Sequence, residues 1–300
     1  MEAKVILNVS GRTDIVAFYT DWFMNRLKEG YVDVRNPFNP QMVSRIFMED
    51  VDLICFCTKN PIPILNRIKE IDKKVYFHIT LTGYQKDIEP GLPDKKDIIK
   101  AIKELSQIIG KDNIVIRYDP IFISDKYNVD YHIKAFEKIC EHLTGYVSKI
   151  LIHFINDYKN VQRNYNVLKF KTITQEDYIK LAIAFGKISK KYNVPVFTCN
   201  EEIDFTEYGF IKDECLSKEL IFKLTGKIYK KKWNARKDLL CNCVNMVDIG
   251  SYNSCKHFCK YCYANFNEKN VLDNFSKHDV NSSLLIGKLK ENDIIKVRKE

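Results

Sequence analysis

Two hydrophobic patterns alternate along the chain. In one, apolar residues recur every three or four positions, as do Ile98, Ile102, Leu105 and Ile109, and this pattern predicts amphipathic helices. Helices are predicted in this way at residues 95–109, 131–143 and 175–192. The other pattern is a short apolar run, which predicts a strand. Such runs occupy residues 5–9, 31–34, 53–57, 75–81, 114–118, 150–155, 194–198 and 244–249.

Strands that alternate with helices predict βα units around a parallel sheet. Seven or eight such units favour an α/β fold of the TIM-like (β/α) barrel type, with parallel strands that are closed or nearly closed; a doubly wound open sheet is the alternative. The 300 residues suffice for such a barrel, which commonly takes about 250. Because no repeat or Gly/Ser-rich linker interrupts the pattern, residues 1–300 are predicted to form a single barrel domain.

A cysteine motif lies near the C-terminal end of the chain. Cys255, Cys259 and Cys262 have the spacing C-x3-C-x2-C, with Tyr261 just before the third cysteine. Cysteine thiolates hold iron–sulfur clusters, and three thiolates leave one iron of a 4Fe–4S cubane open. S-adenosylmethionine, which has an adjacent amine and carboxylate, could chelate that iron, and one electron would then release a 5′-deoxyadenosyl radical. Zinc, with His257 or Cys243 as fourth ligand, and three metal-free thiols are the alternatives.

The motif has a predicted place in the barrel. Closure would bring the strand at 244–249 beside the strand at 5–9. A cluster-binding loop at about residues 250–266 would then reach the same mouth as the loop that follows the first strand. This position of the motif is a prediction of the barrel interpretation.

Four further cysteines, Cys199, Cys215, Cys241 and Cys243, are candidates for a second metal site that holds zinc or a cluster, with ordinary thiols as the alternative. Cys55, Cys57 and Cys140 lie in apolar surroundings and are predicted to be core residues. The first ten residues do not resemble a secretory signal, so we expect a cytoplasmic protein whose cysteines serve metal or redox sites.

Polar side chains stand where the predicted strands end, which is where barrels of this kind build their sites. Single members have structural alternatives: Arg12 and Asp14 could pair or cap a helix, Asp119 could be a turn residue, and His78 could be a core histidine. The set is a stronger indication of a site than any member. It comprises Arg12, Asp14, Asn36, Lys59, Asn60, His78, Arg117, Asp119, Asn156, Glu201 and Glu202.

The formal net charge is +9. Most lysines stand beside acids, but one basic run at residues 227–237 has Tyr229 and Trp233 interleaved and is a candidate phosphate contact. A solvated surface is the favoured interpretation of this run, and nucleic acid is the less favoured partner. No apolar run approaches the roughly 20 residues that span a bilayer, so no membrane partner is expected.

Six stretches, 10–14, 34–40, 58–61, 86–90, 117–120 and 248–255, carry a resemblance to a known family. The chain resembles a bacterial family related to the radical S-adenosylmethionine superfamily, whose cluster motif lies at the C-terminal end. Queuine lyase is a characterised member of that family. The resemblance implies a barrel and a 4Fe–4S cluster on Cys255, Cys259 and Cys262. It also implies S-adenosylmethionine as cofactor and an electron donor such as flavodoxin or ferredoxin.

The implied activity is a lyase reaction that converts queuine to 7-aminomethyl-7-deazaguanine, in salvage of the queuosine precursor for tRNA modification. Arg12, Lys59, Asn60, Arg117 and Tyr261 then become candidates for binding S-adenosylmethionine. The deazapurine would be contacted by residues from the remaining set, which are Asp14, Asn36, His78, Asp119, Asn156, Glu201 and Glu202. Two rival functions remain: a radical enzyme of nucleic-acid repair or modification, and a zinc-stabilised binding module that is not an enzyme.

Overall fold

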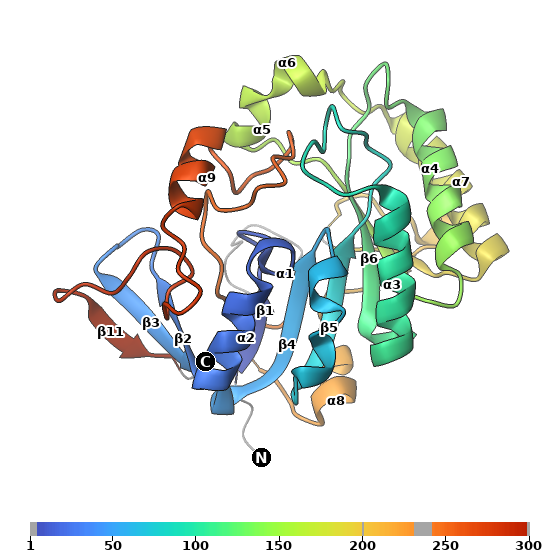
Figure 1. Cartoon of the computed structure of the whole chain (residues 1–300). Helices are drawn as coiled ribbons and strands as arrows, with labels where there is room; N and C mark the ends of the chain where they lie inside the picture. Colours follow the sequence, from blue (N-terminus) through green and yellow to red (C-terminus); the bar gives the residue numbers. More distant parts are fainter. Residues whose placement is uncertain (1–4, 200, 231–241, 299–300) are drawn as a thin grey trace.

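The computed structural model describes residues 5–199, 201–230 and 242–298. Its centre is a parallel sheet with the order β10-β1-β4-β5-β6-β7-β8-β9 (Figure 1). From β4 to β9, the strands of this sheet stand side by side in chain order. The strands are β1 (Val5–Val9), β4 (Val51–Thr58), β5 (Lys74–Thr80), β6 (Ile114–Ile121), β7 (Lys149–Phe154), β8 (Val196–Thr198), β9 (Ile211–Lys212) and β10 (Val247–Asp248).

The sheet does not close. In the described part of the chain β9 pairs with β8 and β10 pairs with β1, and no hydrogen bonds join β9 to β10. The prediction of a closed or nearly closed TIM-like barrel is therefore wrong, and the fold is an open α/β sheet. The last strands offer few backbone groups for pairing: β8 has three residues, and β9 and β10 have two each.

The end of the predicted strand at 244–249 does lie beside the first strand. Leu7 pairs with Val247 and Asn8 pairs with Asp248, in parallel register. The chain that follows β10 therefore emerges at the carboxyl end of β1, as was predicted from closure. This neighbour relation is confirmed although the closure itself is not.

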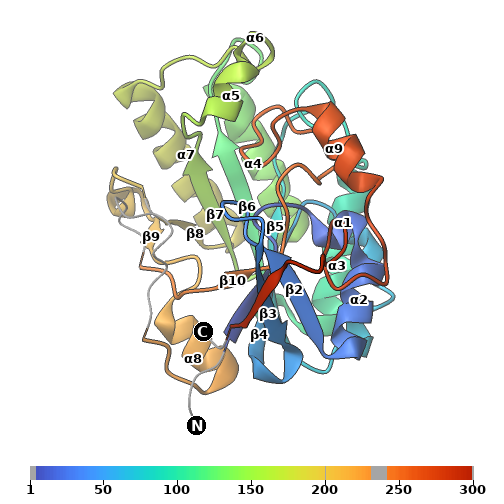
Figure 2. The same cartoon turned by 90° about the vertical axis from the view of Figure 1, so that its left-hand side faces the viewer.

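Helices cover the outer face of the sheet (Figures 1 and 2). The predicted helices at 95–109 and 175–192 are found with these bounds, and the one predicted at 131–143 begins two residues earlier. Asp94 caps α3, and Thr174 forms a capping box with Asp177 at α7. The helices are α1 (Ile15–Phe18), α2 (Thr20–Glu29), α3 (Lys95–Ile109), α4 (Val129–Leu143), α5 (Lys159–Arg163), α6 (Tyr165–Leu168), α7 (Gln175–Tyr192), α8 (Lys218–Thr225) and α9 (Glu268–Phe275).

Both faces of the sheet bury apolar side chains, as is usual for parallel strands. The outer core contains Ile54, Phe56 and Phe77 under the helices. The inner face has a separate apolar group in which Leu53 and Cys55 pack with Ile221 of α8. Cys55 and Cys140 are buried, which confirms them as core residues, whereas Cys57 is half-buried.

A small second sheet stands beside the main one, with the order β11-β3-β2. Its strands are β2 (Tyr31–Arg35), β3 (Met42–Phe47) and β11 (Ile294–Val297). The apolar run at 31–34 thus forms a strand, but outside the main sheet. Among the described residues, no helix has the length and apolar character that a membrane span requires.

His132 of α4 makes polar contacts with β6 and with the residue that follows it. Its Nδ1 lies 2.8 Å from the Tyr118 hydroxyl and its Nε2 lies 2.9 Å from the Phe122 carbonyl oxygen. Since a carbonyl only accepts, Nε2 donates, and in the neutral ring Nδ1 accepts from the Tyr118 hydroxyl. Burial lowers the pKa of His132 to about 4.

A histidine with a depressed pKa stabilises the fold at high pH, and this contribution is lost as the pH falls from the unfolded value of about 6.5 towards 4. We expect the wild type to lose about 3 kcal/mol more between pH 7 and pH 4 than His132→Gln does. Urea unfolding at the two pH values measures the difference. Parallel pH profiles for the two proteins would contradict this role of His132.

Candidate functional site

The loop between β10 and α9 carries the three motif cysteines and lies over the carboxyl ends of the main strands (Figure 1). Cys259 is buried, and Cys255 and Cys262 are half-buried. Burial raises the pKa of the Cys259 thiol to about 12, although Lys59 acts in the opposite direction. Burial likewise raises the pKa of Cys255 and of Cys262. Thiols in such surroundings become thiolates when a cation binds them.

Compact groups of metal-ligating side chains occur elsewhere in the fold. The described chain has two groups of three side chains whose ligand atoms lie within 4.8 Å of one another, and the motif cysteines form neither of them. The assignment of the motif cysteines to a cluster or to zinc therefore stays a prediction.

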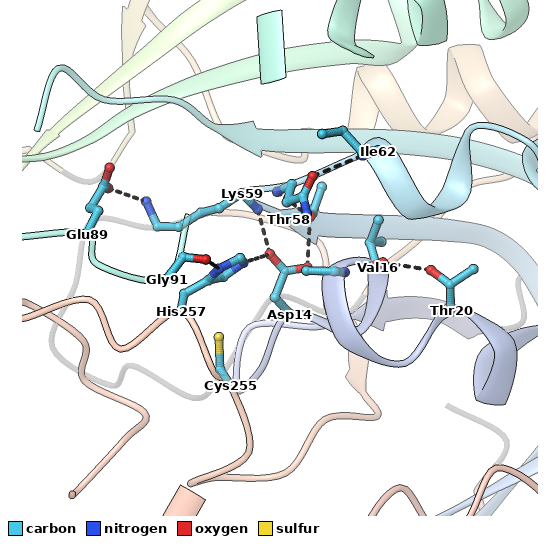
Figure 3. Close-up of polar contacts among 12 residues, drawn as sticks. Asp14, Val16, Thr20, Thr58, Lys59, Ile62, Glu89, Gly91, Cys255 and His257 are labelled. Carbon is cyan, nitrogen blue, oxygen red and sulfur yellow. Dashed lines mark hydrogen bonds and ion pairs between the residues drawn. The ribbon is translucent and has the colours of Figure 1, made fainter. Parts of the chain in front are cut away.

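An Asp–His pair ties the cysteine loop to the first strands (Figure 3). The Nε2 atom of His257 lies 2.9 Å from Asp14, whose carboxylate also accepts from the Thr58 hydroxyl at 2.8 Å and from the Lys59 backbone N–H at 2.7 Å. The Nδ1 atom of His257 faces the Gly91 carbonyl at 3.4 Å. His257 is thus engaged by protein groups at both ring nitrogens, which argues against it as a fourth zinc ligand.

The backbone of the cysteine loop also rests on the loop that follows β5. Gly91 donates to the His257 carbonyl at 3.0 Å, and Lys260 donates to the Ile88 carbonyl at 2.9 Å. A Cβ at Gly91 would meet the Lys256 carbonyl oxygen at 2.5 Å, so glycine permits this close approach. Phe258, inside the motif, has a φ of 53°, an uncommon value for a bulky residue.

A buried carboxylate, Glu89, organises the charges beside the loop. It accepts from Thr82 at 2.8 Å and from Lys59 at 3.0 Å, and also from Lys95 and Tyr261. Burial alone would raise the pKa of Glu89, but the two lysines lower it to about 2. The Lys59 ammonium also donates to the Tyr261 hydroxyl at 2.6 Å. The site therefore contains a paired, half-buried cation close to Cys259.

Asp248, at the end of β10, joins the cysteine loop to β1. Its carboxylate accepts from the Ser10 hydroxyl at 2.9 Å, from Arg12 Nε at 3.0 Å, and from the backbone N–H groups of Gly11 and Gly250, both at 2.7 Å. Arg12 thus pairs with Asp248 and not with Asp14. Among the predicted cofactor residues, Arg12 serves here as a structural contact.

A second set of polar side chains lines the ends of β6 to β8. Arg117 donates to Asp119 at 2.6 Å, and His153 contacts Glu201. Burial lowers the pKa of His153, but Glu201 and Asp119 outweigh it and raise the pKa overall. Asn156 lies 2.8 Å from the His153 ring. The predicted residues Arg117, Asp119, Asn156 and Glu201 are thus in one region of the fold.

Other predicted site residues lie elsewhere or serve the local backbone. Asn36 accepts from Phe38 in the turn between β2 and β3, outside the main sheet, because its strand belongs to the small sheet. The Asn60 side chain accepts from the backbone of Ile62, and Glu202 is exposed.

The basic run at 227–237 lies partly outside the described residues, and Lys227 and Tyr229 both bind Asp52, each at 2.6 Å. These two side chains pack against the first residues of β4, so they are structural contacts. They therefore do not support the phosphate-binding alternative.

The two compact ligand groups lie on the inner face of the sheet. Cys55, Cys57 and His78 form one, and Cys199, Cys215 and Cys243 form the other. Within the described chain, His78 Nε2 has no hydrogen-bond partner, and burial together with Arg117 lowers the pKa of His78 to about 4. Cys243 therefore sits in a different group from the motif cysteines, and Cys241 lies outside the described residues. These cysteine and histidine groups could hold metal ions.

Sequence reasoning missed Glu89 and Lys95 as site residues. Glu89 lies in the connection between β5 and α3, and Lys95 is the first residue of α3, so neither stands at the end of a predicted strand. An acid followed by proline, in a long connection rich in charges, was the available signal.

Comparison with known proteins identifies one family for this chain. Residues 6–264 match the model of a family described as "Domain of unknown function (DUF1848)", and the chain belongs to this family. No curated protein matches the chain. Among solved structures, the chain is similar to a candidate alpha-L-fucosidase from Bacteroides thetaiotaomicron VPI-5482. The identity is 13%, 59% of this chain and 74% of that chain are covered, and the TM-score is 0.25.

The family match corrects the expectation drawn from the resemblance. The chain was expected to belong with the radical S-adenosylmethionine superfamily and to resemble queuine lyase. The family found over nearly the whole chain is instead one whose description carries no function. Function has to be argued from the site.

Proposed function

We propose that this member of the DUF1848 family is an enzyme that holds a 4Fe–4S cluster on Cys255, Cys259 and Cys262 and uses S-adenosylmethionine to start radical cleavage of a small nucleobase-like substrate. Queuine, with 7-aminomethyl-7-deazaguanine as product, is the substrate we would test first. The observation that carries the proposal is the loop itself. Three cysteines lie in one loop at the carboxyl ends of the strands, and the buried Cys259 is close to the half-buried, charged Lys59.

The donor set fits such a cluster. Three thiols offer three ligands, and His257, the other metal-ligating side chain in the motif, is held by Asp14 and Gly91. Backbone N–H groups of Ala264 and Asn265 lower the pKa of Cys262 against the larger effect of burial. Hydrogen bonds to cluster sulfurs and exclusion of solvent are the means by which proteins tune such clusters.

When bound, the cluster would pass one electron from a flavodoxin- or ferredoxin-type donor to the sulfonium of S-adenosylmethionine, giving methionine and a 5′-deoxyadenosyl radical that abstracts hydrogen from the substrate. The protein's own contribution is position and charge. The Lys59 ammonium has three donors, and Glu89 and Tyr261 accept from two of them. We assign the remaining donor to the carboxylate of the cofactor, a charge-assisted contact.

The polar groups at the ends of β6 to β8 are suited to a substrate with hydrogen-bond donors. Asp119 and Glu201 are carboxylates held in place by Arg117 and His153. Such anchored carboxylates would accept from the edge of a nucleobase or balance a protonated amine. Their pairing keeps them oriented before the substrate binds, which reduces the cost of ordering the site.

Anaerobic reconstitution with iron and sulfide tests the proposal. We expect a brown protein with about four irons per chain, which releases 5′-deoxyadenosine under reducing conditions, and more of it when queuine is present. Cys259→Ala should lose both iron and cleavage, and Lys59→Met should keep the iron while cleavage of S-adenosylmethionine falls at least tenfold.

Cys140→Ala, which removes a buried cysteine of α4, is the matched control and should retain iron and activity. A colourless protein, or full cleavage by Cys259→Ala, would overturn the proposal. Cleavage that is indifferent to queuine would reject that substrate and keep the reaction class.

A further inference from the structure

A second group of cysteines converges where the sheet fails to close. Cys199 directly follows β8, Cys215 follows β9, and Cys243 precedes β10. Their three sulfur atoms lie within 4.8 Å of one another. Cys199 and Cys243 are buried and Cys215 is half-buried. Three chain-distant thiols are therefore held together at one point inside the fold.

The distances match those of ligands around one metal ion. The Sγ atoms of Cys199 and Cys243 are 3.8 Å apart, nearly twice the length of a disulfide bond, which is about 2.05 Å. A tetrahedral zinc ion with zinc–sulfur distances of about 2.3 Å has sulfur–sulfur edges of about 3.8 Å. The separation of this pair fits a shared zinc ion, and the third sulfur also lies within 4.8 Å of both. A cubane would hold the thiolates farther apart.

Neighbouring N–H groups donate hydrogen bonds to the sulfur atoms. The backbone N–H of Cys215 donates to Cys199 Sγ at 3.4 Å, and Arg117 Nη1 donates to Cys215 Sγ at 3.7 Å. Arg117 is in turn oriented by Asp119 at 2.6 Å. Three thiolates on a divalent ion carry a net charge of −1, and Arg117, which also pairs with Asp119, brings a positive charge next to one of the sulfurs. Such contacts orient ligands and stabilise a metal–thiolate centre.

The position also offers an entry path and a structural role. A pocket lined by Cys199 and Asn242 borders the group, and Glu201, Asp204 and Asp213 make its wall acidic, which attracts cations. Within the described residues, hydrogen bonds do not join β9 to β10. An ion held by residues next to β8, β9 and β10 would link the two open edges of the sheet.

We propose that Cys199, Cys215 and Cys243 supply three of the four ligands of a zinc-class divalent ion that joins the β9 edge of the sheet to the β10 edge. This centre is separate from the motif cysteines and does not depend on the proposed radical activity. Its ligand chemistry is that of soft thiolates, which select zinc over hard cations such as magnesium or calcium. Its role is to stabilise the fold.

Metal analysis of the full chain tests the proposal. Protein expressed with zinc and treated with a weak chelator is expected to keep one zinc per chain. The single variants Cys199→Ser, Cys215→Ser and Cys243→Ser should each lose it and unfold at a lower temperature. Cys140→Ser, a buried cysteine in no ligand group, is the matched control and should keep the zinc.

A variant with Cys255, Cys259 and Cys262 all changed to alanine separates this centre from the proposed cluster, because it should lose iron and retain the zinc. Zinc that disappears from this variant would overturn the assignment. So would iron, and not zinc, bound at Cys199, Cys215 and Cys243.

Cobalt provides a test that does not depend on the folding of variants. Wild-type protein freed of metal and titrated with Co²⁺ should develop the absorption of a tetrahedral cobalt–thiolate site, saturate at one equivalent and regain thermal stability. Blocking the thiols with a mercurial should abolish the signal. The absence of thiolate-to-cobalt absorption, with an unchanged melting temperature, would overturn the proposal.

Discussion

Replacing Glu89 with alanine is expected to lower the free energy of unfolding by about 3–5 kcal/mol, the effect of breaking a buried ion pair from one side. Glu89 has a side chain that is 1% exposed and accepts from both Lys59 and Lys95. Without the carboxylate, two cations would remain close together with no counter-charge. Urea unfolding at pH 7 measures the loss.

The control and the reciprocal variant make this expectation specific. Glu137 forms an ion pair with Lys191 on the surface, so Glu137→Ala should have a much smaller effect. Combining Glu89→Leu with Lys59→Met removes the carboxylate and the less exposed of its two cations, leaving Lys95, and should recover part of the stability. A loss for Glu89→Ala no larger than that for Glu137→Ala would show that the network does not stabilise the fold.

The pH dependence of the stability that Glu89 contributes follows from the direction in which its pKa is shifted. The lysines lower the pKa of Glu89 to about 2 against the opposing effect of burial. A depressed pKa stabilises the folded state above the unfolded value, which is about 4.3 for glutamate, and the contribution is lost as the pH falls towards 2. The difference between wild type and Glu89→Gln should therefore stay constant above about pH 5 and shrink below it.

Replacing Asp248 with alanine is the second change with a large expected effect, a loss of about 3 kcal/mol. The carboxylate accepts from Ser10, Gly11, Arg12 and Gly250, and each donor left without a partner adds a desolvation cost. Because these contacts join β10 to β1, we also expect faster amide exchange in residues 247–262. Thermal unfolding and hydrogen exchange measure the two effects.

Asp279 supplies the control for this prediction. It pairs with the exposed Lys288 at 3.0 Å, so Asp279→Ala removes a carboxylate of the same type from the surface. Asp248→Asn keeps an acceptor oxygen and should fall between wild type and Asp248→Ala. If Asp248→Ala had the same melting temperature and the same amide exchange rates as Asp279→Ala, the contact between β1 and β10 would have to be attributed to backbone pairing alone.

Local patterns predicted the elements of the fold well and their assembly less well. The helices at 95–109 and 175–192 were found within their predicted bounds because apolar spacing and end residues are local signals. Closure depended on how the last strands pair. Within the apolar run at 244–249, only Val247–Asp248 forms a strand. An apolar residue in that run is equally satisfied by packing against α8, as Val244 is.

For the candidate site, too, the local features were predicted and the contacts between distant residues were not. The spacing of Cys255, Cys259 and Cys262 is visible in the sequence because all three lie in one short loop. The partners of the loop are distant: Asp14 lies more than two hundred positions from His257. A pair of this kind has no periodicity, and single polar residues have several plausible partners. Of the two alternatives for Arg12 and Asp14, pairing with each other is wrong because Arg12 binds Asp248, whereas Asp14 does cap a helix, α1.

The sequence by itself determined the alternation of strands and helices, the parallel sheet and the short stretch that holds three cysteines. These follow from hydrophobic periodicity and close spacing, which act over a few residues. The tertiary structure alone decided that the sheet stays open while β10 still pairs with β1, that the buried Glu89 binds Lys59, and that Cys199, Cys215 and Cys243 meet. Such contacts depend on which distant segments exclude water from one another, and the energy of that burial belongs to the assembled fold and not to any stretch of the chain.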